Sequence, residues 1–288
     1  MTILMTGLCE KGADQIWKQC NDAMYAQGVT WLEEAAYAGD AEAWFFLGHC
    51  YSWGDGAVGF NEKKAYECYL RGASAGSARA VLGALRAGQY DEQMKQSARY
   101  SIEESYRQVR DAAEMGDVYA AWQMGEAVEW EDLADYMPQT ESAREQCLFW
   151  YERAADGGII PAMVKMGKCC QNGTYREKDE KEALRWANQC AASGEVWGLF
   201  QMGEHYRQEE DWEAAFQYDY AAAKQGSSRA MLYLGQMYLN GQGTERDIQA
   251  AVQALEGAAA RNEAESFEEL GNLFYQDELV ERDDEKAF

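Results

Sequence analysis

Residues 230–247, AMLYLGQMYLNGQGTERD, decide the fold. Ala230, Leu234 and Tyr238 stand four residues apart, and this spacing places them on one stripe of an α-helix. A glycine directly follows Leu234, and a Leu-Gly or Met-Gly pair whose glycine stands five positions after a small residue recurs along the chain. The seven pairs end at Gly48, Gly83, Gly125, Gly167, Gly203, Gly235 and Gly271.

A second pattern precedes each of these helices. It consists of apolar residues, two variable residues, two small residues and a turn residue three positions later. The turn residues are Gly39, Gly76, Gly116, Gly158, Gly194, Gly226 and Asn262. Glycine and asparagine suit the left-handed C-cap of a helix. The repeat is therefore helix, loop, helix and tight turn, 32 to 42 residues long, and because one hairpin cannot bury both faces, neighbours must stack. The sequence predicts an all-α solenoid.

Residues 230–247, followed by Ala251 and Ala258-Ala259, resemble the Sel-one-like repeat, a relative of the tetratricopeptide repeat with a longer loop. Residues 43–56 and 270–287 are similar. The resemblance covers about residues 26–288 and implies an α/α right-handed superhelical solenoid of stacked helix-loop-helix repeats. It also implies an adaptor that holds other proteins together, without catalysis. The regular cysteine pairs of the disulfide-bridged branch are absent, so no disulfide is expected from the resemblance.

We expect a single repeat domain over residues 1–288. Residues 1–25 are expected to form an N-terminal capping segment, residues 26–262 the helical repeats, and residues 263–288 an incomplete last repeat. Two explanations of that last repeat stay open. Either the natural chain continues, or another chain covers Phe267, Leu273 and Phe274, which would give a homo-oligomer through this end.

The charge balance excludes several classes of partner. The chain has 26 Lys and Arg against 50 Asp and Glu, a net charge of −24. Nucleic-acid binding and anionic membrane surfaces both require clustered basic residues, so neither is expected, whereas a basic partner is. No signal peptide and no uncharged apolar stretch of about 20 residues is visible, which favours a cytoplasmic protein.

Catalysis, metal binding and cofactors are not expected. The chain has 2 His and 8 Cys, with no Cys-x-x-Cys pair, phosphate loop or nucleophile elbow. Cys147 and Cys190 take small-residue positions of the repeat and are interpreted as buried core thiols.

One helix face is the candidate site. Positions two, six and nine beyond the small residue lie roughly opposite the core stripe, and by resemblance to tetratricopeptide solenoids this face lines a concave groove. Its aromatic residues indicate a surface that binds a partner protein or peptide, with Glu126, Glu129 and Glu204 holding basic groups. Two alternatives stay open: the rings pack between adjacent helices, or the groove serves an enzyme or a small-molecule-binding protein. The candidate residues are Phe45, His49, Trp53, Tyr119, Trp122, Glu126, Trp130, Lys168, Trp197, Phe200, Glu204 and Arg207.

Two loops are longer than the others, around residues 88–98 and 129–142. Insertions in a solenoid emerge on one edge and often contribute to binding. The alternative is that the helices simply run longer there.

Overall fold

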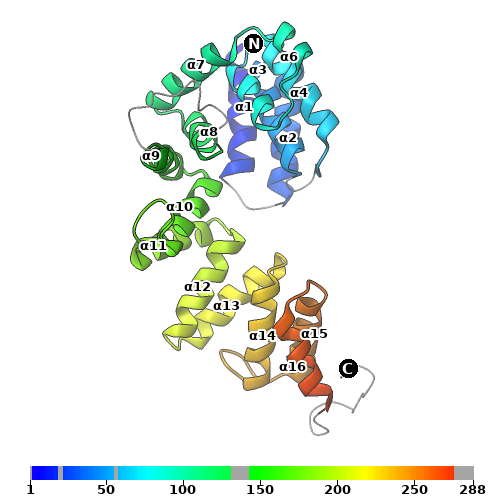
Figure 1. The fold of residues 1–288 in the computed structure, drawn as a ribbon. Coiled ribbons are helices and arrows are strands. Elements are labelled where there is room, and N and C mark those ends of the chain that lie inside the picture. The colour runs from blue at the N-terminus through cyan, green and yellow to red at the C-terminus, as the bar shows by residue number, and fades with distance from the viewer. Residues whose placement is uncertain (1, 19–21, 55–57, 131–142, 276–288) are drawn as a thin grey trace. The chain divides into compact units, whose positions relative to one another are not determined.

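The computed structural model of the protein describes residues 2–18, 22–54, 58–130 and 143–275. These residues form sixteen α-helices and no strand (Figure 1). The chain folds as two compact units, Met1–Glu180 and Lys181–Phe288. Stacked helical hairpins make up each unit, so the predicted all-α repeat fold is confirmed; a single domain over the whole chain stays a prediction. None of the described helices combines the length and apolar character needed to cross a bilayer.

The first unit pairs its helices along the chain. Helix α1 packs on α2, α3 on α4, α5 on α7 and α8 on α9, while α10 packs on α9. These helices are α1 (Thr2–Trp17), α2 (Asp22–Tyr37), α3 (Ala41–Trp53), α4 (Glu62–Ala75), α5 (Ala78–Arg86), α6 (Glu92–Ser97), α7 (Ile102–Glu114), α8 (Val118–Glu129), α9 (Ala143–Asp156) and α10 (Ile160–Asn172).

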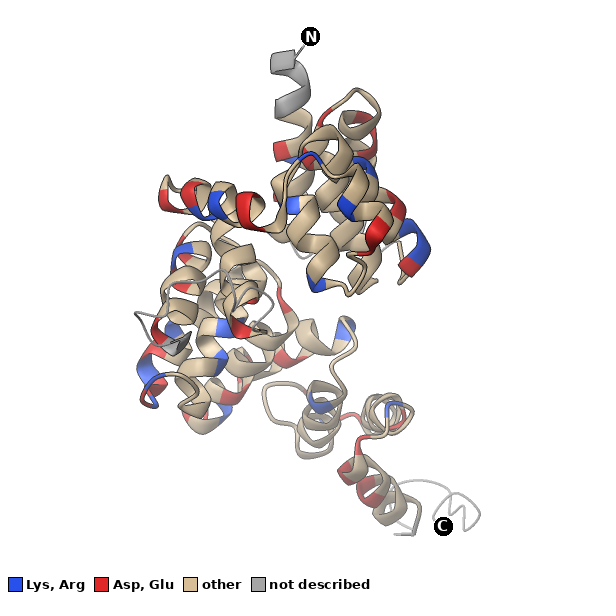
Figure 2. Cartoon of the chain, turned by 45° about the horizontal axis from the view of Figure 1, so that its top comes forward, with Lys and Arg blue, Asp and Glu red and all other residues tan. Residues whose placement is uncertain are grey.

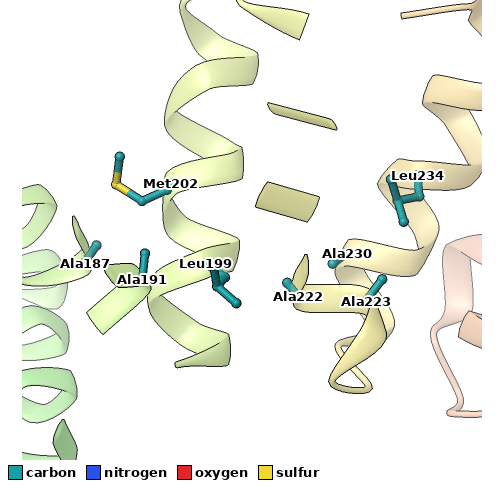
Figure 3. Close-up of a cluster of buried hydrophobic side chains, with 8 residues drawn as sticks. All are labelled: Ala187, Ala191, Leu199, Met202, Ala222, Ala223, Ala230 and Leu234. Carbon is teal, nitrogen blue, oxygen red and sulfur yellow. The ribbon is translucent and has the colours of Figure 1, made fainter. Parts of the chain in front are cut away.

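The second unit continues the same pattern. Helix α12 packs on α13, and α14 on α15. Its helices are α11 (Glu180–Ala192), α12 (Val196–Gln208), α13 (Trp212–Lys224), α14 (Ser228–Asn240), α15 (Ile248–Ala259) and α16 (Ala264–Tyr275). Small residues dominate one buried cluster, in which the large buried members are Leu199, Met202 and Leu234. Its alanines come from α11, α13 and α14, and Leu199 and Met202 come from α12 (Figure 3).

The seven predicted turn residues all have left-handed backbone conformations. The φ angles are 104° at Gly39, 106° at Gly76, 102° at Gly116, 93° at Gly158, 80° at Gly194, 94° at Gly226 and 61° at Asn262. Residues with a larger side chain rarely adopt these angles, which explains why the turn positions hold glycine or asparagine. The repeat register read from the sequence is confirmed.

The glycine inside each Leu-Gly or Met-Gly helix is where a neighbouring helix comes closest. A Cβ atom on Gly48 would lie 2.6 Å from the Tyr69 ring, and one on Gly125 would lie 2.6 Å from the Tyr151 ring. Gly235 is equally close to Leu255. At Gly48, Gly125 and Gly235 the glycine therefore receives a large side chain from the next helix of its hairpin.

The first hairpin, α1 with α2, lacks the Leu-Gly or Met-Gly pair of the other repeats. Helix α1 packs on α2 through Gly12 and Gly28, and a Cβ on either would lie 2.9 Å from the other's carbonyl oxygen. Residue 11 is lysine rather than Leu or Met, so the segment did not match the repeat pattern. The expected capping segment thus contains a full helix, and its boundary at residue 25 falls inside α2.

The first long loop holds an additional helix. Residues 92–97 form α6, which packs on α4 and buries Met94, while the Tyr66 hydroxyl donates to the Asp91 carboxylate at the start of α6. The alternative that the flanking helices simply run longer is wrong here, since α5 ends at Arg86. Most of the second long loop lies outside the described residues.

The last described helix corrects an expectation. Leu273 and Phe274 are buried with Leu232 and Leu255, because their stripe of α16 faces the preceding hairpin. They therefore need no second chain to cover them. Phe267 is exposed, so the expected contact with another chain stays a prediction for that residue alone. Residues 276–288, the rest of the incomplete repeat, lie outside the described part of the chain.

The prediction that Cys147 and Cys190 are buried is confirmed. All seven cysteines that the structure describes are buried. Burial raises the pKa of Cys147 to about 12, so its thiol stays protonated at neutral pH. Over the same described residues, no group of three or more His, Cys, Asp or Glu side chains is arranged to hold a metal ion.

The helix glycines give a first testable prediction. Gly125→Ala should lower the free energy of unfolding by about 1–3 kcal/mol, because the added methyl collides with Tyr151, a ring tied by its hydroxyl to Glu129. Urea unfolding measures the change. Gly7→Ala is the matched control, since no neighbouring atom lies within 4 Å of a Cβ there. Equal stability of Gly125→Ala and wild type would contradict the packing argument.

Candidate binding site

A cavity of about 160 Å³ lies in the first unit where α3, α5 and α8 meet. Helix α3 contributes Phe45, His49 and Trp53, and α8 contributes Glu126, so four predicted site residues line one cavity. Their spacing of three to four residues brings them to one helix face. Gly83 of α5 leaves room for two rings, since a Cβ there would lie 2.7 Å from Tyr69 and 3.2 Å from Phe45.

The cavity has a closed floor and an aromatic mouth. Phe45 is 4% exposed and Tyr69 is buried, and the Ser52 hydroxyl donates to the Tyr69 hydroxyl at 3.2 Å. Phe45 was expected on an open face, but its ring forms a wall of the cavity. Trp53, by contrast, is 50% exposed, and Phe60 beside it is also exposed.

His49 is the ionisable group of the floor. Burial, with a further contribution from the Arg86 guanidinium, lowers its pKa to about 4, so the imidazole is neutral at pH 7. Nε2 lies 4.0 Å from Oε2 of Glu126, and neither ring nitrogen has a hydrogen-bond partner.

Gln123 adds a second polar group to the floor. Its side-chain amide donates to the backbone oxygen of Arg79 at 3.0 Å, while Oε1 is buried without a partner. Sequence reasoning missed this residue because it lies one position from Trp122, outside the positions assigned to the groove.

We use the name mouth for Trp53 and Arg86, which line the cavity, and Trp130, which contacts Arg86 but is not a lining residue. Arg86, the last residue of α5, places its guanidinium carbon 5.3 Å from the centre of the Trp53 ring and 4.5 Å from that of Trp130. Trp130 is 58% exposed. Both distances are within the range of cation–π attraction. In the sequence Arg86 stands three positions after Gly83, where several other repeats have an aromatic residue. This departure from the repeat was the sequence signal for Arg86.

Other predicted residues of the first unit lie elsewhere. Tyr119 packs on Trp17 and donates its hydroxyl to Asp14 at 2.6 Å. Trp122 is half-buried against Tyr151, and Lys168 is exposed on α10. Glu129, expected to hold a partner's basic group, instead accepts the Tyr151 hydroxyl at 2.7 Å and pairs with Lys165.

The second unit carries Trp197, Phe200, Glu204 and Arg207 on α12. Arg207 stacks 3.7 Å from the centre of the Tyr233 ring and forms an ion pair with the fully buried Asp219. Burial raises the pKa of Asp219 to about 6, although Arg207 opposes the rise. Glu204 accepts a hydrogen bond from Gln201 at 3.2 Å.

Sequence reasoning also missed Asp219, although a signal existed. Asp219 stands seven residues before its turn glycine, the position that Tyr69, Tyr151 and Leu255 take in other repeats. A carboxylate in a position otherwise filled by large apolar residues is unusual and marks a buried ion pair.

Comparison with known proteins identifies the repeats. The model of the Sel1 repeat matches residues 23–40, 41–77, 118–159, 160–195, 228–262 and 268–288. An uncharacterized protein of Neisseria meningitidis serogroup B is 28% identical over 174 residues, which cover 59% of this chain and 34% of that relative. The chain therefore spans about a third of the length of this relative.

A similar solved structure shares the fold. A protective antigen of uropathogenic Escherichia coli strains, which displays an SLR fold, matches 98% of this chain and 59% of its own at 22% identity and a TM-score of 0.63. A Sel1 repeat protein from Oxalobacter formigenes matches 93% of this chain and 86% of its own at 22% identity and a TM-score of 0.46.

The buried imidazole predicts a pH dependence. Because the pKa of His49 is about 4 in the folded chain and about 6.5 when unfolded, the unfolded chain binds more protons between these values. His49 therefore makes stability fall as pH decreases from 6.5 towards 4. When pH falls from 7 to 5, the unfolding free energy of His49→Gln should decrease by about 2 kcal/mol less than that of the wild type. His205→Gln in the second unit is the control, and an unchanged loss in His49→Gln would refute the assignment.

Asp219 predicts a pH dependence of stability opposite in sign to that of His49. Its pKa is about 6 in the folded chain against 3.8, so here the folded chain binds more protons between these values. Its contribution is present below pH 4 and is lost as pH rises through 6. As pH rises from 4.5 to 7, the wild type should lose on the order of 2 kcal/mol of unfolding free energy that Asp219→Asn does not lose. Urea unfolding of both proteins at the two pH values measures this change. A difference that does not change with pH would count against this behaviour.

Proposed function

The chain belongs to the Sel1 repeat family, and on that basis we propose that it is a non-enzymatic scaffold that binds a partner protein or peptide through the aromatic mouth of its first unit. Proteins of this family generally act as protein-interaction scaffolds and are typically without enzymatic activity. The specific surface and the nature of the partner are our own proposal.

The observation that carries the proposal is the exposed pair of tryptophans at a preformed cavity. Trp53 and Trp130 are each at least half exposed, and the Arg86 guanidinium contacts both rings. Tryptophan and arginine are the residues most enriched among those that dominate binding energy, especially around a pocket. Because Trp130 follows α8 and Trp53 ends α3, rigid helices hold both rings, so little conformational entropy would be lost on binding.

Helix α12 offers a separate surface in the second unit. Phe200 contacts Tyr233, and the ion pair with Asp219 holds Arg207 against the same ring. An arginine fixed in this way is ready to bind a carboxylate or a backbone carbonyl of a peptide. We include Trp197, Phe200, Glu204 and Arg207 as a second contact region.

The charge of the chain favours a basic partner. Figure 2 shows Lys and Arg interspersed with Asp and Glu along the coloured helices. With a net charge of −24, long-range attraction would speed association with a positively charged protein. The compartment we propose is the cytoplasm, where buried thiols such as those described here stay reduced.

The proposal is tested by selecting peptides from a random display library on the full chain. The selected peptides should bind Trp53→Ala/Trp130→Ala at least about tenfold more weakly than wild type, because truncating such residues commonly costs more than 1.4 kcal/mol. Isothermal titration measures the affinities, and circular dichroism checks the helices. Tyr37→Ala is the control, an exposed ring on α2 away from the cavity. Peptides that bind the double variant as tightly as wild type would overturn the proposal.

A further inference from the structure

The size and walls of the cavity suit a single ring. Its volume is about 160 Å³, and an apolar protein cavity of about 150 Å³ is large enough to bind benzene. Phe45, Trp53, Phe60 and Tyr69 line it together with Leu82. Aromatic rings attract one another edge to face or in offset stacks, so these walls favour an aromatic guest over an aliphatic one of equal size.

Two buried acceptors at the floor lack a donor. Gln123 is 6% exposed, and its Oε1 has no hydrogen-bond partner. His49 is neutral and so has one N–H and one acceptor nitrogen; with the hydrogen on Nε2, towards Glu126, Nδ1 is the acceptor. A buried acceptor without a donor costs about 1–3 kcal/mol, which an N–H or O–H group of a guest would recover. Ser52 and Tyr69 already bond to each other.

Burial in the cavity disfavours an ionic guest. Arg86, Glu62 and Glu126 all line the cavity, so charges of both signs surround it and do not select a guest of one sign. A charged guest would lose its hydration on entering the apolar part of the cavity, which costs more free energy than burying a neutral guest. A neutral group with a donor avoids this larger cost and suits the unpaired acceptors.

From the ring-sized space and the unpaired acceptors we propose that the cavity between α3, α5 and α8 binds one tyrosine or tryptophan side chain of the partner, with its O–H or N–H donating to Gln123 or His49. The inference rests on the proposed function and names the anchor residue that this function requires. Trp53 and Trp130 then contact the flanking residues of the peptide.

Small probes test the cavity without a partner. The full chain is titrated with p-cresol, 3-methylindole, toluene and propylguanidinium, which represent the tyrosine, tryptophan, phenylalanine and arginine side chains. We expect p-cresol or 3-methylindole to bind at least fivefold more tightly than toluene, and propylguanidinium not to saturate. Toluene binding as tightly as both donors, or tighter binding of propylguanidinium, would overturn the inference.

Two variants locate the bound probe. His49→Phe keeps a ring but removes an acceptor, so the preference for p-cresol over toluene should fall at least twofold. Ala127→Leu fills the cavity and should abolish saturable binding, whereas Ala192→Leu, at an exposed position of α11, should leave it unchanged. Thermal unfolding shows whether His49→Phe and Ala127→Leu are folded. If one of them is not, the probe titration of the other tests the location. A folded Ala127→Leu that binds p-cresol like wild type contradicts the location.

The selected peptides separate this inference from the proposed function. Peptides that depend on Trp53 and Trp130 should share a tyrosine or tryptophan, and replacing that residue by leucine should weaken binding at least tenfold. If they depend on the two tryptophans but share no such residue, the inference is wrong and the scaffold function stands. If binding does not depend on the two tryptophans, the proposed function is wrong.

Discussion

The structure depends on one steric constraint, the glycine at the middle of every second helix. At Gly48, Gly125 and Gly235 a side chain from the neighbouring helix occupies the space that a Cβ would need. The missing Cβ leaves room inside the hairpin for a large ring or a leucine from the neighbouring helix, and the alanine stripes then pack one hairpin on the next. The glycine is thus a packing requirement, distinct from the turn glycines, which are needed for their backbone angles.

The cavity lies beside Gly83, where the glycine faces two rings rather than one side chain. Gly83 receives Tyr69 from the preceding repeat and Phe45 from α3, and both rings are walls of the cavity. Two rings therefore converge on one glycine, and Arg86 replaces the aromatic residue that other repeats place three positions further along. The binding site we propose follows from this local departure from the repeat.

The repeat pattern was sufficient to predict most of the helices because each repeat carries its own helix glycine and turn residue. It could not predict α1, since Lys11 precedes Gly12, nor α6, whose anchor Met94 stands alone between two loops. Of the site, the spacing on α3 and α8 indicated His49, Trp53 and Glu126, but the cavity depends on how three helices approach, which a pattern along one chain does not contain. Asp219 and Arg86 were visible as departures from the repeat, and their partners became clear only from the contacts.

The central claim is that the partner binds at the mouth between Trp53 and Trp130. The most direct measurement is a crystal structure of the full chain with a selected peptide bound. The account predicts a peptide ring inside the cavity, its donor within hydrogen-bond distance of Gln123 or His49, and peptide backbone against the two tryptophans. A peptide bound elsewhere with the cavity unchanged would contradict it.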